Sequence, residues 1–150
     1  MIFSTVSQMF NQVTNEHLNR ELYFYKKSGD WKGISGREIR STVKDIAFGL
    51  QSLGLGKGSN VALLSNNSPR WAMSDYGIIC SGAATVSVYP TLISSQIEYI
   101  LNDSHAKVVM VDYNKDALSQ LTTELGVNAI AQHTNLLDAD SCAAMVPEIL

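Results

Sequence analysis

The sequence predicts an α/β fold: alternating βαβα units that form a mostly parallel sheet with flanking helices, preceded by an N-terminal helix and a hairpin. Two observations carry this prediction. Short, continuous apolar runs at 61–64, 85–88 and 108–111 are typical of parallel strands that are covered on both faces. Amphipathic segments of helical spacing separate these runs, and the links are short, as in βαβ units with right-handed crossovers.

A helix and a hairpin are predicted before the alternating part. Ser4 and Thr5 can cap a helix whose apolar residues follow at helical spacing. These residues are Val6, Met9, Phe10 and Val13. Residues 22–25 then form a short aromatic strand, 28–30 a turn with a central glycine, and 31–34 the returning strand.

The next helix begins with a capping box at 35–38. The Ser35 hydroxyl can accept the backbone N–H of Glu38, and the Glu38 carboxylate can reach back to the N–H of Ser35. Gly54 suits the left-handed position just past the end of this helix. One apolar stripe marks its buried face: Ile39, Val43, Ile46, Ala47, Leu50 and Leu53.

Further helix starts are recognisable in the alternating part. Ser68 and Pro69 supply an N-cap and a proline at the first helical position of a helix that runs to about 81–82. A second capping box is predicted at 95–98, with Ser95 as its cap. The prediction is completed by a helix from about 114, a fourth strand at 127–131 and a terminal helix at 139–145.

Composition places the chain among globular proteins of one domain. It is 45% apolar and 17% charged, with a net charge of −3 and no basic run longer than Lys26-Lys27, so a nucleic-acid partner is not expected. The uncharged stretch at 76–97 holds too many serines and threonines for a spanning helix, and no signal peptide is visible. Two unpaired cysteines favour a cytoplasmic location.

The familiar catalytic and metal-binding patterns do not occur in the sequence. Three glycines at 54–58 follow a helix and precede a strand, the reverse of a dinucleotide fingerprint, so they are interpreted as a helix end and turn. There is no P-loop, no Cys-x-x-Cys and no nucleophile elbow, and His17, His105 and His133 lack metal-ligand spacing. No catalytic residue and no metal site is therefore predicted in this chain.

One candidate site remains, at the turn that carries Tyr89, Pro90 and Thr91. This turn directly follows a predicted strand, and residues 66–68 follow the preceding strand in the same way. Ligands of open α/β sheets bind outside the carboxyl ends of the strands. Turn chemistry and helix capping are the competing interpretation of both turns, and the residues alone favour it.

Six short sequence segments, in the same order along the chain, resemble the N-terminal region of the adenylate-forming (AMP-binding) enzymes. The resemblance is closest to the long-chain fatty-acid–CoA ligases. The six segments lie at 31–38, 49–54, 61–71, 82–83, 88–92 and 97–104, within a match over about 20–120. The Tyr-Pro-Thr form at 89–91 favours the long-chain acyl branch. An acidic residue is more usual in the family at the position of Arg70.

The resemblance implies a two-step reaction for a parent enzyme. A fatty carboxylate attacks ATP in the presence of Mg2+, giving acyl-adenylate and pyrophosphate, and the thiol of coenzyme A then displaces AMP. The family's phosphate loop, its adenine and ribose motifs and its C-terminal lid have no match here. Residues 1–150 are therefore expected to be an N-terminal α/β subdomain that is inactive alone and binds no ATP, Mg2+ or coenzyme A. Tyr89, Pro90 and Thr91 are expected near the acyl and coenzyme A channel of the parent.

Alternatives stay open at this point. The parent could be another adenylate-forming enzyme, such as an aryl ligase or a peptide-synthetase adenylation domain, or the chain could be a stand-alone, non-enzymatic α/β binding module. The expected partners are the remainder of the same enzyme and the fatty acid and coenzyme A of the parent, together with a homodimer through an unpaired sheet edge. Peripheral attachment to a membrane is left open beside the cytoplasmic location.

Overall fold

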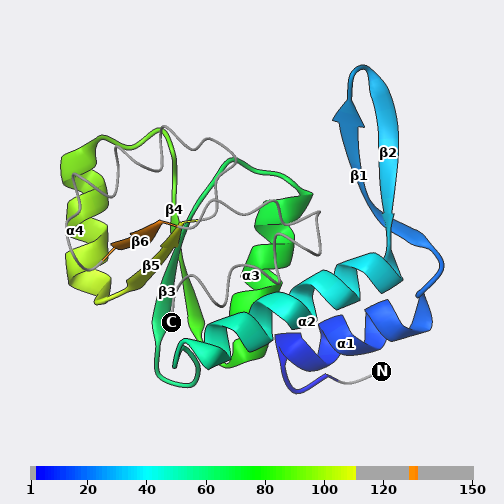
Figure 1. Ribbon diagram of the computed structural model, residues 1–150, viewed down its shortest axis with the longest axis horizontal. Coiled ribbons are helices and arrows are strands. Elements are labelled where there is room, and N and C mark those ends of the chain that lie inside the picture. The colour runs from blue at the N-terminus through cyan, green and yellow to red at the C-terminus, as the bar shows by residue number, and fades with distance from the viewer. Residues whose placement is uncertain (1–2, 111–128, 132–150) are drawn as a thin grey trace.

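The computed structural model describes residues 3–110 and 129–131, and it has the predicted α/β architecture (Figure 1). An N-terminal helix and a hairpin are followed by alternating helices and strands as far as residue 110, and residues 129–131 form a further strand. The predicted helix from about 114, the terminal helix at 139–145 and Cys142 lie outside the described residues. In the part of the chain that is described, no helix has the length and apolarity needed to cross a membrane.

Helix α1 (Val6–Glu16) and the hairpin of β1 (Glu21–Lys27) and β2 (Asp30–Ser35) form as predicted. Thr5 caps α1, because its hydroxyl accepts the N–H of Gln8 at 3.1 Å. The hairpin closes through Ser28 and Gly29, whose φ angles of 54° and 92° are both left-handed. Such a two-residue turn matches the twist of the strands that it joins.

Helix α2 (Gly36–Ser52) begins with the predicted capping box at Ser35 and Glu38. The N–H of Ser35 donates to the Glu38 carboxylate at 2.9 Å, and the N–H of Glu38 donates to the Ser35 hydroxyl at 3.3 Å. Gly54 adopts a left-handed φ of 74° beyond the end of the helix, also as predicted.

Replacing Ser35 by alanine should lower the free energy of unfolding by about 1 kcal/mol at neutral pH, because the variant loses this cap. The hydrogen bonds from Ser35 hold the pKa of the Glu38 carboxyl below its usual value in the folded state. A carboxyl group whose pKa is lower in the folded state than in the unfolded state stabilises the fold at pH values above its unfolded-state pKa. This stabilisation is lost as the pH falls through the folded-state pKa. Urea titrations should therefore show a difference between wild type and variant that shrinks in acid.

Ser41, an exposed serine on the same helix, provides the control for this measurement. The Ser41→Ala variant should unfold within about 0.5 kcal/mol of the wild type at every pH, as surface substitutions usually do. An equal loss in both variants, or a Ser35 effect that grows in acid, would contradict the capping argument.

The central sheet is parallel and has the order β4-β3-β5-β6. Its strands are β3 (Asn60–Leu64), β4 (Ala84–Val88), β5 (Lys107–Met110) and β6 (Ala129–Ala131). Helix α3 (Pro69–Ser81) connects β3 to β4, and α4 (Ser94–Ser104) connects β4 to β5. Ser68 caps α3 and Pro69 occupies its first turn, as the sequence predicted.

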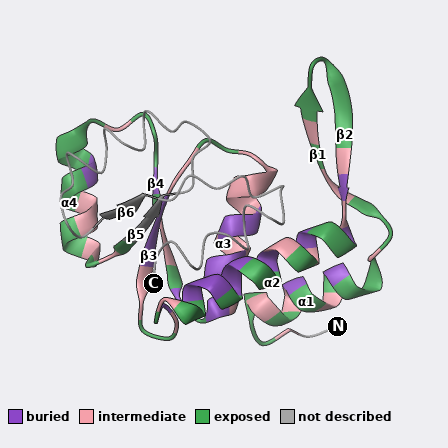
Figure 2. Cartoon of the chain, viewed as in Figure 1, coloured by how far each residue is buried: buried purple, intermediate pink, exposed green. Residues whose placement is uncertain are grey.

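Residues of β3 alternate between the two faces of this sheet, and both faces are covered. Val61 and Leu63 pack with α2 and α3, whereas Ala62 and Leu64 pack with α4. A third apolar cluster joins α1, α2, α3 and the hairpin, outside the sheet. Figure 2 shows the buried residues concentrated on β3 and on the facing sides of α2 and α3.

The predicted start of α4 is wrong by two residues. The helix begins at Ser94 with Ile93 as its N-cap residue, and the Gln96 side chain accepts the N–H of Ile93 at 3.3 Å. Packing explains the shift, because this start places Leu92 just before the cap and Ile97 in the first full turn. Both side chains enter the same apolar cluster, in the arrangement of a hydrophobic staple.

Candidate functional site

The candidate turn lies beside the turn that follows β3. Strands β3 and β4 are parallel neighbours, and their last residues, Leu64 and Val88, pair in register. Residues 65–68 and 89–93 therefore leave the sheet at the same edge. The structure thus brings together the two turns on which the sequence placed a candidate site.

These neighbouring turns lead to opposite faces of the sheet. The chain leaves β3 toward α3, which packs on the face of Val61 and Leu63, and leaves β4 toward α4, which packs on the face of Ala62. The strand order reverses between β3 and β5, so the topological switch point of the sheet lies on the other side of β3 from the Tyr89 turn. Ligands of open α/β sheets bind outside the carboxyl ends of the strands, and both turns lie at that edge.

The turn at Tyr89 is held at both ends and exposed between them. Val88 is buried and Leu92 is half-buried, both in the cluster under α4. The N–H of Leu92 donates to the carbonyl of Tyr89 at 3.2 Å, which closes a four-residue turn with Pro90 at its favoured second position. Pro90 and Thr91 are exposed, and the Tyr89 side chain is 71% exposed. The turn thus presents an aromatic ring and a hydroxyl on a fixed backbone.

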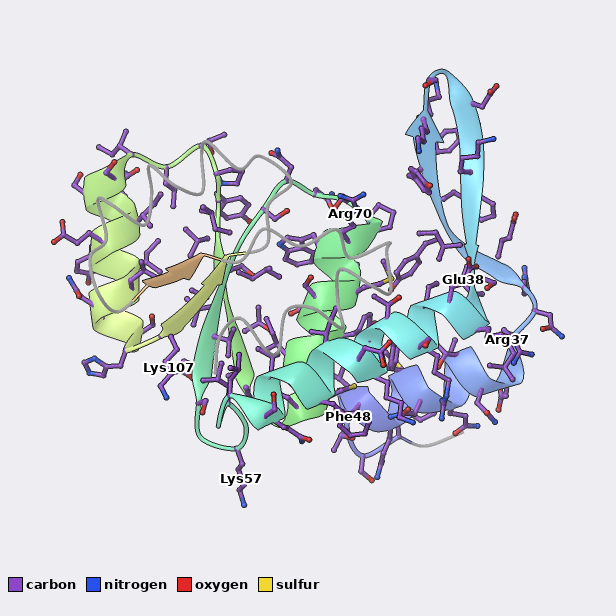
Figure 3. The ribbon with its side chains drawn as sticks, viewed as in Figure 1. Arg37, Glu38, Phe48, Lys57, Arg70 and Lys107 are labelled. Carbon is purple, nitrogen blue, oxygen red and sulfur yellow. The ribbon has the colours of Figure 1, made fainter. Side chains whose placement is uncertain are left out.

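The turn after β3 contributes polar groups to the same edge. Asn66 and Asn67 are exposed, and the Ser68 hydroxyl accepts the N–H of Trp71 at 3.2 Å. The N-terminus of α3 therefore lies at this edge, with Arg70 in its first turn (Figure 3). These groups can hydrogen-bond a polar ligand, but none of them is a general acid or base.

A groove lies between the hairpin and the first half of α3, with a volume of about 530 Å³. Residues Tyr23, Phe24, Trp71 and Tyr76 line it, together with Asp75. Burial raises the pKa of Tyr23 to about 12, with smaller contributions from Tyr76 and Asp75, so this phenol stays protonated and can donate a hydrogen bond. Sequence reasoning missed this groove, because its two sides come from segments far apart in the chain.

The described residues hold neither a metal-ligand cluster nor an activated thiol. No group of three or more His, Cys, Asp or Glu residues in this part of the chain could hold a metal ion. Cys80 is half-buried between α1 and α3, and burial raises the pKa of its thiol, an effect that the Ser7 hydroxyl partly offsets. The thiol is therefore held in its less nucleophilic, protonated form.

Comparison with known proteins gives one family. The model of the AMP-binding enzyme family matches residues 10–148. The long-chain-fatty-acid–CoA ligase ACSBG1 of Rattus norvegicus is 32% identical over 111 residues, which are 74% of this chain and 15% of that protein. Fatty acyl-CoA synthetase A of Dictyostelium discoideum is 34% identical over 93 residues, which are 62% of this chain and 14% of that protein.

Solved structures of adenylate-forming enzymes share the fold. The N-terminal domain of FACL13 from Mycobacterium tuberculosis superposes with a TM-score of 0.73 at 21% identity, covering 97% of this chain and 36% of that one. The fatty acid AMP ligase from Legionella pneumophila gives a TM-score of 0.72 at 18% identity, covering 93% of this chain and 25% of that one. This chain spans only about 15% of the length of the ACSBG1 relative. Because the family model covers nearly all of its residues, the chain belongs to the AMP-binding enzyme family.

Proposed function

We propose that residues 1–150 are the N-terminal α/β subdomain of an ATP-dependent acyl-CoA ligase that activates a long-chain fatty acid as acyl-adenylate and transfers it to coenzyme A. Membership of the AMP-binding enzyme family supports the class of reaction. The relatives are named as long-chain-fatty-acid–CoA ligases and a fatty acyl-CoA synthetase. These names support a long-chain fatty acid as the acid that is activated and coenzyme A as its acceptor.

The proposed reaction has two displacements. A carboxylate oxygen of the fatty acid attacks the α-phosphorus of ATP, and pyrophosphate leaves with the electrons of the broken P–O bond, while Mg2+ neutralises phosphate charge. The sulfur of coenzyme A then attacks the acyl carbonyl carbon, its proton passes to a base, and AMP leaves. The phosphate loop and lid expected for the first step have no counterpart in this sequence, so the chain alone is expected to be inactive.

Within that enzyme, the turn of Tyr89, Pro90 and Thr91 is proposed to form part of the wall of the acyl and coenzyme A channel. The observation that carries this proposal is the pairing of Leu64 with Val88, by which the turn lies beside the turn after β3, outside the carboxyl ends of the strands. The exposed ring of Tyr89 offers apolar surface and a phenol, and the exposed hydroxyl of Thr91 offers a hydrogen bond.

The test uses the longer polypeptide obtained by reading the coding sequence on past Leu150. In that protein, Tyr89→Ala should raise the KM for coenzyme A about tenfold, the effect of losing about 1.4 kcal/mol of binding. Fatty-acid-dependent exchange of pyrophosphate into ATP should stay at the wild-type rate, because the first displacement does not involve coenzyme A.

Tyr99 is a matched control, since it is 68% exposed and lies in the middle of α4, outside the turn. Tyr99→Ala should leave both half-reactions unchanged. Equal behaviour of the two tyrosine variants would remove the turn from the channel. Pyrophosphate exchange that depends on an aryl acid or an amino acid, and not on a fatty acid, would replace the proposed ligase by another adenylate-forming enzyme.

A further inference from the structure

The far end of the hairpin carries positive charge away from the body of the molecule. The hairpin projects beyond α1 and α2, and its end is exposed on both strands (Figures 1 and 2). Lys26, Lys27 and Lys32 lie there with a single acidic residue, Asp30, whereas the chain as a whole has a net charge of −3. The local charge is thus opposite in sign to that of the chain.

The two faces of the hairpin differ in what they contact. Tyr23, Tyr25 and Ile34 pack into the cluster formed with α1, α2 and α3. Phe24 and Lys26 alternate with those tyrosines along β1 and therefore point to the other face, where Lys26 pairs with Trp31. We call this the outer face of the hairpin.

Aromatic surface and positive charge are combined on the outer face. Trp31 is 66% exposed and Phe24 is 54% exposed, and the Lys26 ammonium lies 5.5 Å from the centre of the Trp31 ring. Phe24 stands opposite Gly33, which has no side chain, and the Glu21 carboxyl occupies the space above that glycine. Glu21 thus lies at the base of the hairpin, whereas the three lysines lie near its end together with Asp30. Lys26 shares the outer face with Trp31, and Lys27 and Lys32 alternate to the other face at the same end.

We propose that the outer face and end of this hairpin dock on an anionic lipid surface. Tryptophan is enriched at membrane interfaces, where its indole ring lies at the level of the lipid headgroups. Lysine ammonium groups are attracted to the phosphates and carboxylates of anionic lipids. Lysine is depleted in the buried cores of protein–protein interfaces, which disfavours a protein as the occupant. The proposal does not depend on the ligase reaction, since neither nucleotide nor fatty acid takes part in the docking.

Co-sedimentation of the 150-residue chain with vesicles tests the proposal. The chain should bind vesicles that contain phosphatidylserine and not vesicles of phosphatidylcholine alone, and added salt should weaken the binding. Replacing Lys26, Lys27 and Lys32 together by glutamine should lower the affinity about a hundredfold, at about fivefold for each charge removed. The tryptophan emission of the wild type should shift to shorter wavelength on the vesicles, and the shift should be absent in Trp31→Ala.

The chain contains a matched control pair on α2. Lys44 lies 5.5 Å from the ring of Phe48, which is 57% exposed on the body of the molecule (Figure 3). Lys44→Gln and Phe48→Ala should bind vesicles like the wild type. The proposal is overturned if phosphatidylserine vesicles do not bind the chain, or if the α2 and hairpin variants lose equal affinity. It is also overturned if Trp31→Ala instead abolishes self-association of the chain in the absence of lipid.

Discussion

Replacing Leu63 by alanine should lower the free energy of unfolding by about 2–5 kcal/mol. Leu63 is 1% exposed on β3, the strand with neighbours on both sides, and it packs with Leu50 of α2 and Ile78 of α3. The substitution removes buried methyl groups and leaves a cavity that two helices and a sheet are too rigid to fill. Urea unfolding followed by circular dichroism measures the loss.

Ile93 provides the comparison for this experiment, because its side chain is 65% exposed. Ile93→Ala removes a similar volume from the surface and should change stability by no more than about 0.5 kcal/mol. If the two variants unfold at the same urea concentration, Leu63 does not lie in the core described here.

Replacing Gly77 by alanine should destabilise the fold by about 1–3 kcal/mol, although alanine is the better helix former. Gly77 lies where α3 crosses α2. An added methyl group would lie 2.8 Å from the Cβ of Ile46 and would collide with its Cγ2 atom. The Ile46 Cβ cannot move without its backbone, so the two helices would have to separate. Thermal or urea unfolding measures the loss.

Two further variants identify the cause of that loss. Gly56→Ala adds the same methyl group where it meets the carbonyl oxygen of Ser81 at an ordinary 3.4 Å, and it should be nearly neutral. Ile46→Gly removes both the Cβ and the Cγ2 atom that the new methyl group would meet, so it should make Gly77→Ala far less costly, and the effects of the two substitutions should not be additive. Additive losses would show that the close helix contact is not the reason.

Elements fixed by local chemistry were predicted well from the sequence. The caps at Thr5, Ser35 and Ser68 each depend on a side chain and the backbone N–H three residues later, and all three form. The start of α4 was misplaced because tertiary packing of Leu92 and Ile97 decides it, and the serines alone do not reveal that packing. At this helix the capping pattern and the burial of apolar side chains favour different first residues, and burial decides the start.

The candidate site was predicted only in part, for a similar reason. The sequence places Tyr89 just past a strand, but the neighbour of that strand depends on the order of strands in the sheet. The position of the turn beside residues 65–68 emerges only from the pairing of Leu64 with Val88. The groove of Tyr23 and Trp71 escaped prediction because nothing local links a hairpin to a helix so much later in the chain.

The strand order has a consequence for synthesis on the ribosome. Strand β3 lies between β4 and β5, yet it leaves the ribosome before either of them. A nascent chain that ends just after β3 therefore carries a strand with two open edges, which is the state most prone to pair with a second chain. Helix α2 is already made at that stage, and its Ile46 and Leu50 can shelter one face of the strand. The helix that precedes the sheet can thus cover one face of β3 before either of its neighbouring strands is made.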